Sequence, residues 1–280
     1  MFAKNYMKPG PGVEKRDPNQ SRFSIFFEIF GEKFWDLIKL NLLYVLFSIP
    51  AFIVTCIVTG FLSTTLLNAI SIDENMIWPA YIALNLFFGI SFGVLLGFGP
   101  STASLTYALR NIGREEHVWL FSDFRDKIKE NFKQSLGLWI LDLVVFALVV
   151  FAYNFYANAG KPMSYLRYLL LSFALIYTML HLFVYQLMIT FKLPLKALMK
   201  NAAILALAKA PKSFILLLFV ALIHMVLPII AIANISSPFM TLIFFALEIF
   251  LLPTITAFVT NFAIYPTIEE YIKIANENKE

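Results

Sequence analysis

Long apolar stretches alternate with shorter polar ones along this chain of 280 residues. Several of the apolar stretches exceed the roughly 18–20 residues that a helix needs to cross a bilayer. Alternation with a period of two, which is typical of transmembrane β-strands, is absent. We therefore expect an all-α polytopic membrane protein, built as a bundle of six transmembrane helices. The predicted spans are residues 40–62, 77–96, 136–155, 168–189, 214–233 and 239–258.

The segment before the first span is amphipathic. From Ser21 onward, phenylalanines recur at helical spacing while charged residues occupy the other faces, which predicts a helix lying at the inner membrane interface. Residues 1–20 are rich in Pro, Gly and charge, and we expect a mobile cytoplasmic tail there. Residues 21–268 would then form one membrane domain, followed by a second tail at 269–280.

The polar connections before the third and fifth spans are also expected to hold amphipathic helices on the cytoplasmic face. In the first, Ser122 or Asp123 can cap a helix whose apolar stripe runs beside basic residues. In the second, three lysines at i, i+4 and i+8 share one face, and Pro211 marks a break before the next span. These basic faces are candidate docking surfaces: Arg125, Lys129 and Lys133 in the first connection, and Lys192, Lys196 and Lys200 in the second.

Charge fixes the expected orientation. Lys and Arg gather in both terminal segments and in the two long connections, and only Lys161 and Arg167 fall elsewhere. By the positive-inside rule, both termini are cytoplasmic and three short connections are external. The chain is 60% hydrophobic and 14% charged, whereas about a quarter of the residues of a soluble domain are charged. The polar N-terminal segment has no cleavage pattern, so the first span is expected to be an uncleaved signal-anchor.

The formal net charge of +4 lies in the loops. Orientation and anionic lipid headgroups account for it, so the bilayer is the expected partner and no nucleic acid is. Three signatures of soluble enzymes are missing from the sequence: the phosphate-binding Gly-x-x-x-x-Gly-Lys-Ser/Thr loop, Gly-x-Gly-x-x-Gly and Gly-x-Ser-x-Gly. We therefore do not expect an enzyme, and ATP hydrolysis would have to come from a partner.

Four ionisable side chains fall inside predicted spans: Asp142, His181, His224 and Glu248. A charge at the bilayer centre costs at least about 2.5–3.5 kcal/mol, so each needs a partner or a function. The four could converge on a site for a substrate or a proton, or they could hydrogen-bond in pairs as structural groups. Cys56 is the only cysteine, and no Glu-x-x-His or His-x-x-x-His spacing occurs, so neither a metal nor a cofactor is expected.

Small residues and prolines mark further features. Gly89, Gly93 and Gly97 repeat at a spacing that lets helix backbones approach closely, either within this chain or against another membrane subunit. A unit of inner helix, span, outer turn and returning span begins near Ser21, Ser122 and Lys196, and two returning spans end in the related sequences GPSTA (99–103) and LPTITA (252–257). Such a pattern is consistent with an internal repeat, which transporters and membrane scaffolds both use.

Residues 97–140 read GFGPSTASLTYALRNIGREEHVWLFSDFRDKIKENFKQSLGLWI. Their marks are Gly-Pro at 99–100, the helix carrying Arg110, the Phe121 and Asp123-Phe124 group, and KENFK at 129–133, joined later by NAAILA at 201–206 and Pro211. On these marks the chain resembles the YesL family of bacterial membrane proteins over most of its length after Ser21. The resemblance implies the cytoplasmic membrane of a bacterium and a role beside carbohydrate ABC importers, and it supplies no catalytic residues.

Two hypotheses about function follow. The first is an accessory membrane protein that associates with the permease or ATPase subunits of an oligosaccharide importer, or helps regulate one. The alternative is an autonomous secondary transporter or channel for a small solute, with Glu248 and Asp142 near the permeation path. The sequence leaves the substrate and the oligomeric state open.

Overall fold

The computed structural model describes residues 20–68, 74–233 and 238–277, and regular structure in this part of the chain is helical throughout. The tail predicted at 1–20 lies outside it, except for Gln20. In the tail predicted at 269–280, the described residues continue helix α10 as far as Glu277. The elements are α1 (Arg22–Glu32), α2 (Phe34–Asn68), η1 (Glu74–Met76), α3 (Ile77–Leu95), α4 (Pro100–Gly113), α5 (Leu120–Ala157), η2 (Met163–Tyr165), α6 (Leu166–Thr190), α7 (Leu195–Ala208), α8 (Ala210–Ala233), α9 (Pro238–Phe250) and α10 (Leu252–Glu277).

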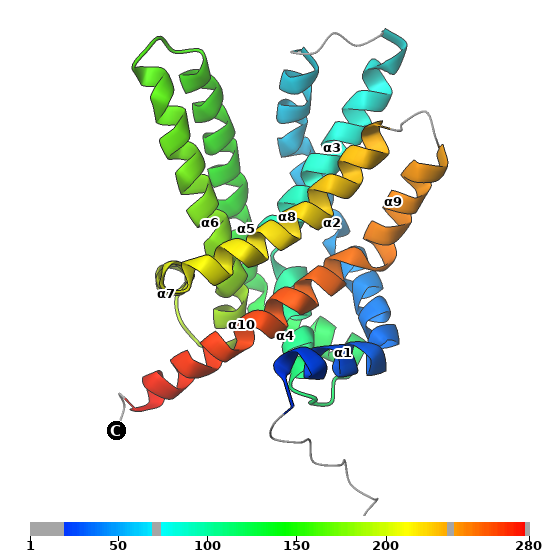
Figure 1. The fold of residues 1–280 in the computed structure, drawn as a ribbon, viewed down its shortest axis with the longest axis vertical. Coiled ribbons are helices and arrows are strands. Elements are labelled where there is room, and N and C mark those ends of the chain that lie inside the picture. Colours follow the sequence, from blue (N-terminus) through cyan, green and yellow to red (C-terminus); the bar gives the residue numbers. More distant parts are fainter. Residues whose placement is uncertain (1–19, 69–73, 234–237, 278–280) are drawn as a thin grey trace, which may run out of the picture.

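Three helical hairpins, α2–α3, α5–α6 and α8–α9, point toward the same end of the molecule, and α1 and α4 lie at the opposite end (Figure 1). We call the second end the base. The first two hairpins diverge as they leave the base, and α8 lies against both of them through α3 and α6. The described ends of the three hairpins therefore share one end of the molecule.

Within the described part of the chain, four helices are long and apolar enough to cross a membrane: Phe34–Asn68, Ile77–Leu95, Leu120–Ala157 and Met163–Thr190. A fifth is added if α7 and the described part of α8, which meet at an angle of 98°, count as one span. Large apolar side chains on these helices face outward, for example Ile57 (74% exposed), Phe151 (67%) and Leu169 (69%). A helix that is apolar on its outer face as well as its inner one suits a lipid surround.

The apolar run that contains the second predicted span continues past residue 96, but it does not form one continuous helix. The chain turns instead, because Gly97 and Gly99 adopt the positive φ angles of 96° and 62° that side-chain-bearing residues rarely take. Pro100 then starts α4 at its first position, where its fixed φ is helical and its missing N–H is not needed. Helix α4 is buried at the base against α2, α5, α6 and α10.

Three predicted helix boundaries are wrong. The amphipathic helix expected from Ser21 ends at Glu32, and after a turn at Lys33 the next helix, α2, runs into the first predicted span. Helix α5 begins at Leu120, ahead of both proposed caps, although the Asp123 carboxylate accepts the Trp119 N–H at 2.9 Å. Helix α7 begins at Leu195, so Lys192 precedes it.

Candidate functional site

A buried carboxylate–histidine pair joins the second hairpin. Asp142 on α5 and His181 on α6 are 0% and 6% exposed, and His181 Nε2 lies 2.9 Å from Asp142 Oδ1. The Tyr177 hydroxyl donates to the same oxygen at 2.6 Å. The other ring nitrogen, Nδ1, lies 2.9 Å from the Tyr177 carbonyl. The two residues predicted inside neighbouring spans therefore contact each other directly.

Geometry shows how many protons this pair holds. A carbonyl oxygen only accepts, so His181 Nδ1 must carry a proton and donate it to Tyr177. If His181 Nε2 and the Asp142 carboxylate were both unprotonated, two lone pairs would face each other at 2.9 Å. A proton therefore sits between Nε2 and Oδ1, and the pair is overall neutral whichever atom carries it.

A second buried carboxylate–histidine pair joins α8 and α9 and also shares a proton. His224 on α8 and Glu248 on α9 are 2% and 4% exposed, and His224 Nδ1 lies 3.0 Å from Glu248 Oε1. His224 Nε2 contacts the Thr256 hydroxyl at 2.9 Å, while that hydroxyl donates to the Leu252 carbonyl at 2.8 Å. The hydroxyl proton is thus already used, so Nε2–H donates to Thr256 and a second proton lies between Nδ1 and Glu248.

Glu248 lies just before a break in the predicted sixth span. Residues 239–258 do not form one helix: α9 ends at Phe250, Leu251 forms a turn, and α10 starts at Leu252. Pro253 causes the break, since it has no N–H to continue the helical ladder. With 13 residues, α9 rises about 20 Å, less than the roughly 30 Å of hydrocarbon in a bilayer.

Asn41 of α2 satisfies the backbone at this break. Its side-chain oxygen accepts the Thr254 N–H at 2.8 Å, and its amide nitrogen donates to the Glu248 carbonyl at 3.4 Å. One buried amide side chain therefore replaces hydrogen bonds that the interrupted helix cannot make. This residue was missed at the sequence level, and the available signal was an amide side chain beside an apolar run.

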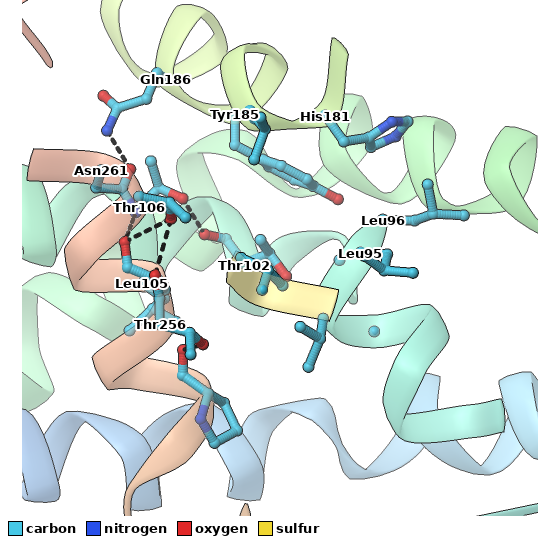
Figure 2. Close-up of a pocket in the computed structure, with 18 of the residues that line it drawn as sticks. Leu95, Leu96, Thr102, Leu105, Thr106, His181, Tyr185, Gln186, Thr256 and Asn261 are labelled. Atoms are coloured by element: carbon cyan, nitrogen blue, oxygen red, sulfur yellow. Dashed lines mark hydrogen bonds between the residues drawn. The ribbon is translucent and has the colours of Figure 1, made fainter. Parts of the chain in front are cut away.

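A cavity of about 90 Å³ lies between α3, α4, α6, α8 and α10. We call it the polar cavity, because hydroxyl, amide and imidazole groups lie among its mainly apolar lining. Figure 2 shows His181, Tyr185 and Gln186 along α6, with Thr256 and Asn261 on α10 and Thr102 and Thr106 on α4. The cavity links the two pairs, since His181 belongs to one and Thr256 binds His224 of the other. The four predicted residues therefore form two separate pairs and no single cluster, and of the four it is His181 that lines this cavity.

Amide groups line the base side of this cavity. Gln186 donates through Nε2 to Asn261 Oδ1, while the buried Gln186 Oε1 has no partner in the described part of the chain. Arg110 donates to the Thr190 hydroxyl at 2.9 Å, and burial, together with the nearby Arg114, lowers the pKa of Arg110. Asn261 also lines a smaller pocket of about 20 Å³ that contains Arg22 and Arg110. Hydrogen-bonding groups thus continue from the cavity toward the base.

The glycine pattern serves packing inside this chain. Gly89 lies against Phe52 and Cys56 of α2, Gly93 lies against the Phe98 ring, and Gly97 lies against Tyr185. All three are buried, and Gly97 lies beyond the end of α3. This arrangement favours the internal-packing interpretation over an interface with another subunit.

The predicted basic docking residues lie at the surface. Lys129 and Lys133 on α5, Lys192 before α7, and Lys196 on α7 are exposed, as is Lys200, one turn after Lys196. Arg125 is also exposed and pairs with Asp126 at 3.2 Å. No group of three or more His, Cys, Asp or Glu residues able to hold a metal occurs in the described ranges.

Residues 80–155 match a family model described as a protein of unknown function, DUF624. The match runs from α3 through α4 to near the end of α5, so it contains residues 97–140 and Asp142. No curated protein and no solved structure matches the chain. The matching family has no described function, so the comparison assigns no activity.

Proposed function

We propose that this chain is a multi-pass protein of the bacterial cytoplasmic membrane that moves a small polar solute, coupled to protons. The observation that carries the proposal is the polar cavity, which is lined by His181 of one carboxylate–histidine pair and by Thr256, the hydrogen-bond partner of His224 in the other pair. Intramembrane ionisable residues beside a cavity, together with a helix broken at the same depth, are features of secondary transporters. In this proposal the chain crosses the membrane six times, with both termini and the base in the cytoplasm.

The pairs supply the coupling. If the Asp142–His181 pair loses its shared proton, the carboxylate and the bare Nε2 repel each other, so His181 must turn or move. Because His181 lines the cavity, its movement changes the cavity wall. A solute would bind to the hydroxyl and amide groups there, above all to the unpartnered Gln186 Oε1. No covalent chemistry is needed, which agrees with the expectation that the chain is not an enzyme.

Proteoliposomes carrying a pH-sensitive dye inside test this proposal. Glycerol, erythritol and ribose would be added outside under a pH gradient, and solute-dependent proton flux would be compared with that of empty liposomes. We expect proton flux with at least one of these solutes. In Asp142→Asn, which lacks the carboxylate that shares a proton with His181, this flux should fall by at least about tenfold. Asp126→Asn, on the exposed face of the same helix, is the matched control and should keep full flux.

Two results would overturn the proposal. One is the absence of solute-dependent flux for all three solutes with a monodisperse wild-type protein. The other is equal flux in wild type and Asp142→Asn. Size-exclusion profiles of both variants show whether a loss of flux reflects misfolding.

A second candidate function is the accessory role beside an oligosaccharide importer, as the YesL resemblance implies. The exposed lysines of α7, Lys196 and Lys200, support it, because a cationic helix face suits an acidic partner surface. Affinity purification from native membranes in mild detergent, followed by mass spectrometry, separates the two functions. Stoichiometric recovery of permease or ATPase subunits would favour the accessory role, whereas recovery of the chain alone would count against it as a stable assembly.

A further inference from the structure

A second, larger cavity of about 330 Å³ lies between α2, α3 and the break that separates α9 from α10. Its wall is mainly apolar, with Val45, Ile49, Phe52 and Ile90 among the lining residues. A volume of this size falls within the usual range of small-molecule sites. Tyr44, Val94 and Pro253 line both this cavity and the polar one, so the two adjoin but differ in chemistry.

One carboxylate stands in this apolar wall. Among the described residues, three polar side chains line the cavity, and two of them are engaged elsewhere: Tyr44 contacts Thr102 at 3.4 Å, and Ser48 contacts Ser101 at 2.8 Å. The third is Glu248, whose Oε1 contacts His224 while its Oε2 is buried without a partner among the described residues. Leaving a buried acceptor unmet costs about 1–3 kcal/mol, and more for a charged one. The cavity therefore offers an apolar volume with one unmet acceptor.

The cavity reaches the outer apolar surface of the molecule. Ile49, on its wall, is 46% exposed, and it lies on the same outward-facing side of α2 as Ile53. In a membrane this surface meets lipid chains, so a molecule that enters here comes from the apolar phase. Its body must be hydrophobic, and its polar part must be a single group able to donate to Glu248.

We propose that this cavity binds a lipophilic amine in its protonated form, with the ammonium group donating to Glu248 Oε2. Before binding, the His224–Glu248 pair is neutral and shares one proton between His224 Nδ1 and Glu248 Oε1. The incoming ammonium brings one positive charge. A proton then leaves the pair, His224 keeps Nδ1–H toward the Glu248 carboxylate, and Nε2 accepts from the Thr256 hydroxyl. One ammonium enters for one proton released, so the net charge of the buried site is unchanged.

The test uses the purified full chain in detergent and 1-aminoadamantane, a compact cage amine, as the probe. Isothermal titration in two buffers of different ionisation enthalpy gives the affinity and the number of protons released. We expect one proton released per amine bound, and binding that strengthens as pH rises below the amine's own pKa. The alcohol of the same shape, 1-adamantanol, should bind at least about tenfold more weakly, because it lacks the charge that Glu248 complements.

Variants separate this site from its neighbours. Glu248→Gln should weaken amine binding at least about tenfold and abolish proton release. Ile90→Trp fills the cavity while leaving Glu248 in place, and should also weaken binding; Ile82→Trp, exposed on the same helix, is its matched control. Asp142→Asn should bind the amine with an affinity within about twofold of wild type. The amine site can therefore fail or hold independently of the proposed transport.

Equal affinity for the amine and the alcohol would overturn the proposal. So would unchanged amine binding in Ile90→Trp, or no binding to the wild-type protein. If Glu248→Gln does not yield a monodisperse protein, the comparison of Ile90→Trp with Ile82→Trp decides whether the amine binds in this cavity.

Discussion

Asn41 shows how much a single uncharged side chain can determine. It connects α2 to two backbone groups that lie 207 and 213 residues further along the chain. The groups it satisfies flank the turn at Leu251, and one of them is the carbonyl of Glu248. The position of that carboxylate therefore depends on an amide in the first long helix.

Replacing this amide tests its role. In Asn41→Leu, the Thr254 N–H and the Glu248 carbonyl lose their partner in a buried place, which we expect to destabilise the fold by about 2–6 kcal/mol at about 1–3 kcal/mol for each group. Thermal unfolding of the purified protein in detergent measures the change. Asn154→Leu is the control and should alter the melting temperature little, because the Asn154 amide donates to Val150 of its own helix and to no other described residue. Equal melting temperatures for Asn41→Leu and wild type would contradict the assigned role.

At the same scale, the sequence identified the ionisable residues but not their grouping. Asp142, His181, His224 and Glu248 stand out because charges inside apolar runs are expensive, and pairing was one of the two open interpretations. Asn41, Gln186 and Asn261 did not stand out, since an amide carries no charge. Their partners come from helices distant in sequence, which no local pattern reveals.

At the scale of elements, each of the three hairpins is followed by a helix that begins at a proline or next to one. Pro100 is the first residue of α4, Pro194 caps α7, and Pro253 is the second residue of α10. The sequence segments around the first and third of these prolines are related. The sequence could not show that the chain changes direction there, because a proline in an apolar run is compatible with a kinked helix as well as with a new one.

The turn between α3 and α4 gives a prediction at this scale. In Gly97→Ala, the new Cβ would lie 2.7 Å from the Tyr185 hydroxyl oxygen, at a backbone φ of 96°. We expect a loss of about 1–3 kcal/mol or more, since the strained backbone alone costs that much. Gly31→Ala, where nothing lies within 4 Å, should leave stability unchanged or slightly raised. Urea or thermal unfolding of both variants measures the difference, and equal effects would show that this turn tolerates a side chain.

At the scale of the whole molecule, the described hairpin ends lie at one end (Figure 1). Helix α7, which carries exposed lysines, lies beside α6 and away from those hairpin ends (Figure 1). The alternation of apolar stretches and charged connections predicted the hairpins, and the side of the membrane on which each end lies stays a prediction. The sequence predicted the sixth span as one helix, because hydropathy does not register a break that a distant side chain satisfies.

Cysteine labelling tests the orientation. In a Cys56→Ser background, the Lys161→Cys variant should react with a membrane-impermeant maleimide in intact cells, because the proposed topology places the connection between α5 and α6 outside. The Lys196→Cys variant should react only after the cells are permeabilised. Both positions are exposed, so a difference in labelling reports the side of the membrane and not burial. The reverse pattern would invert the proposed topology.

The Asn41 contact also bears on how the chain is made. The hairpins look like modules that could be inserted one after another, each complete in itself. Yet Asn41 of α2 satisfies one backbone group of α9 and one of α10. These contacts can form only after some two hundred further residues have been synthesised. The last hairpin therefore does not complete its backbone hydrogen bonds from its own residues.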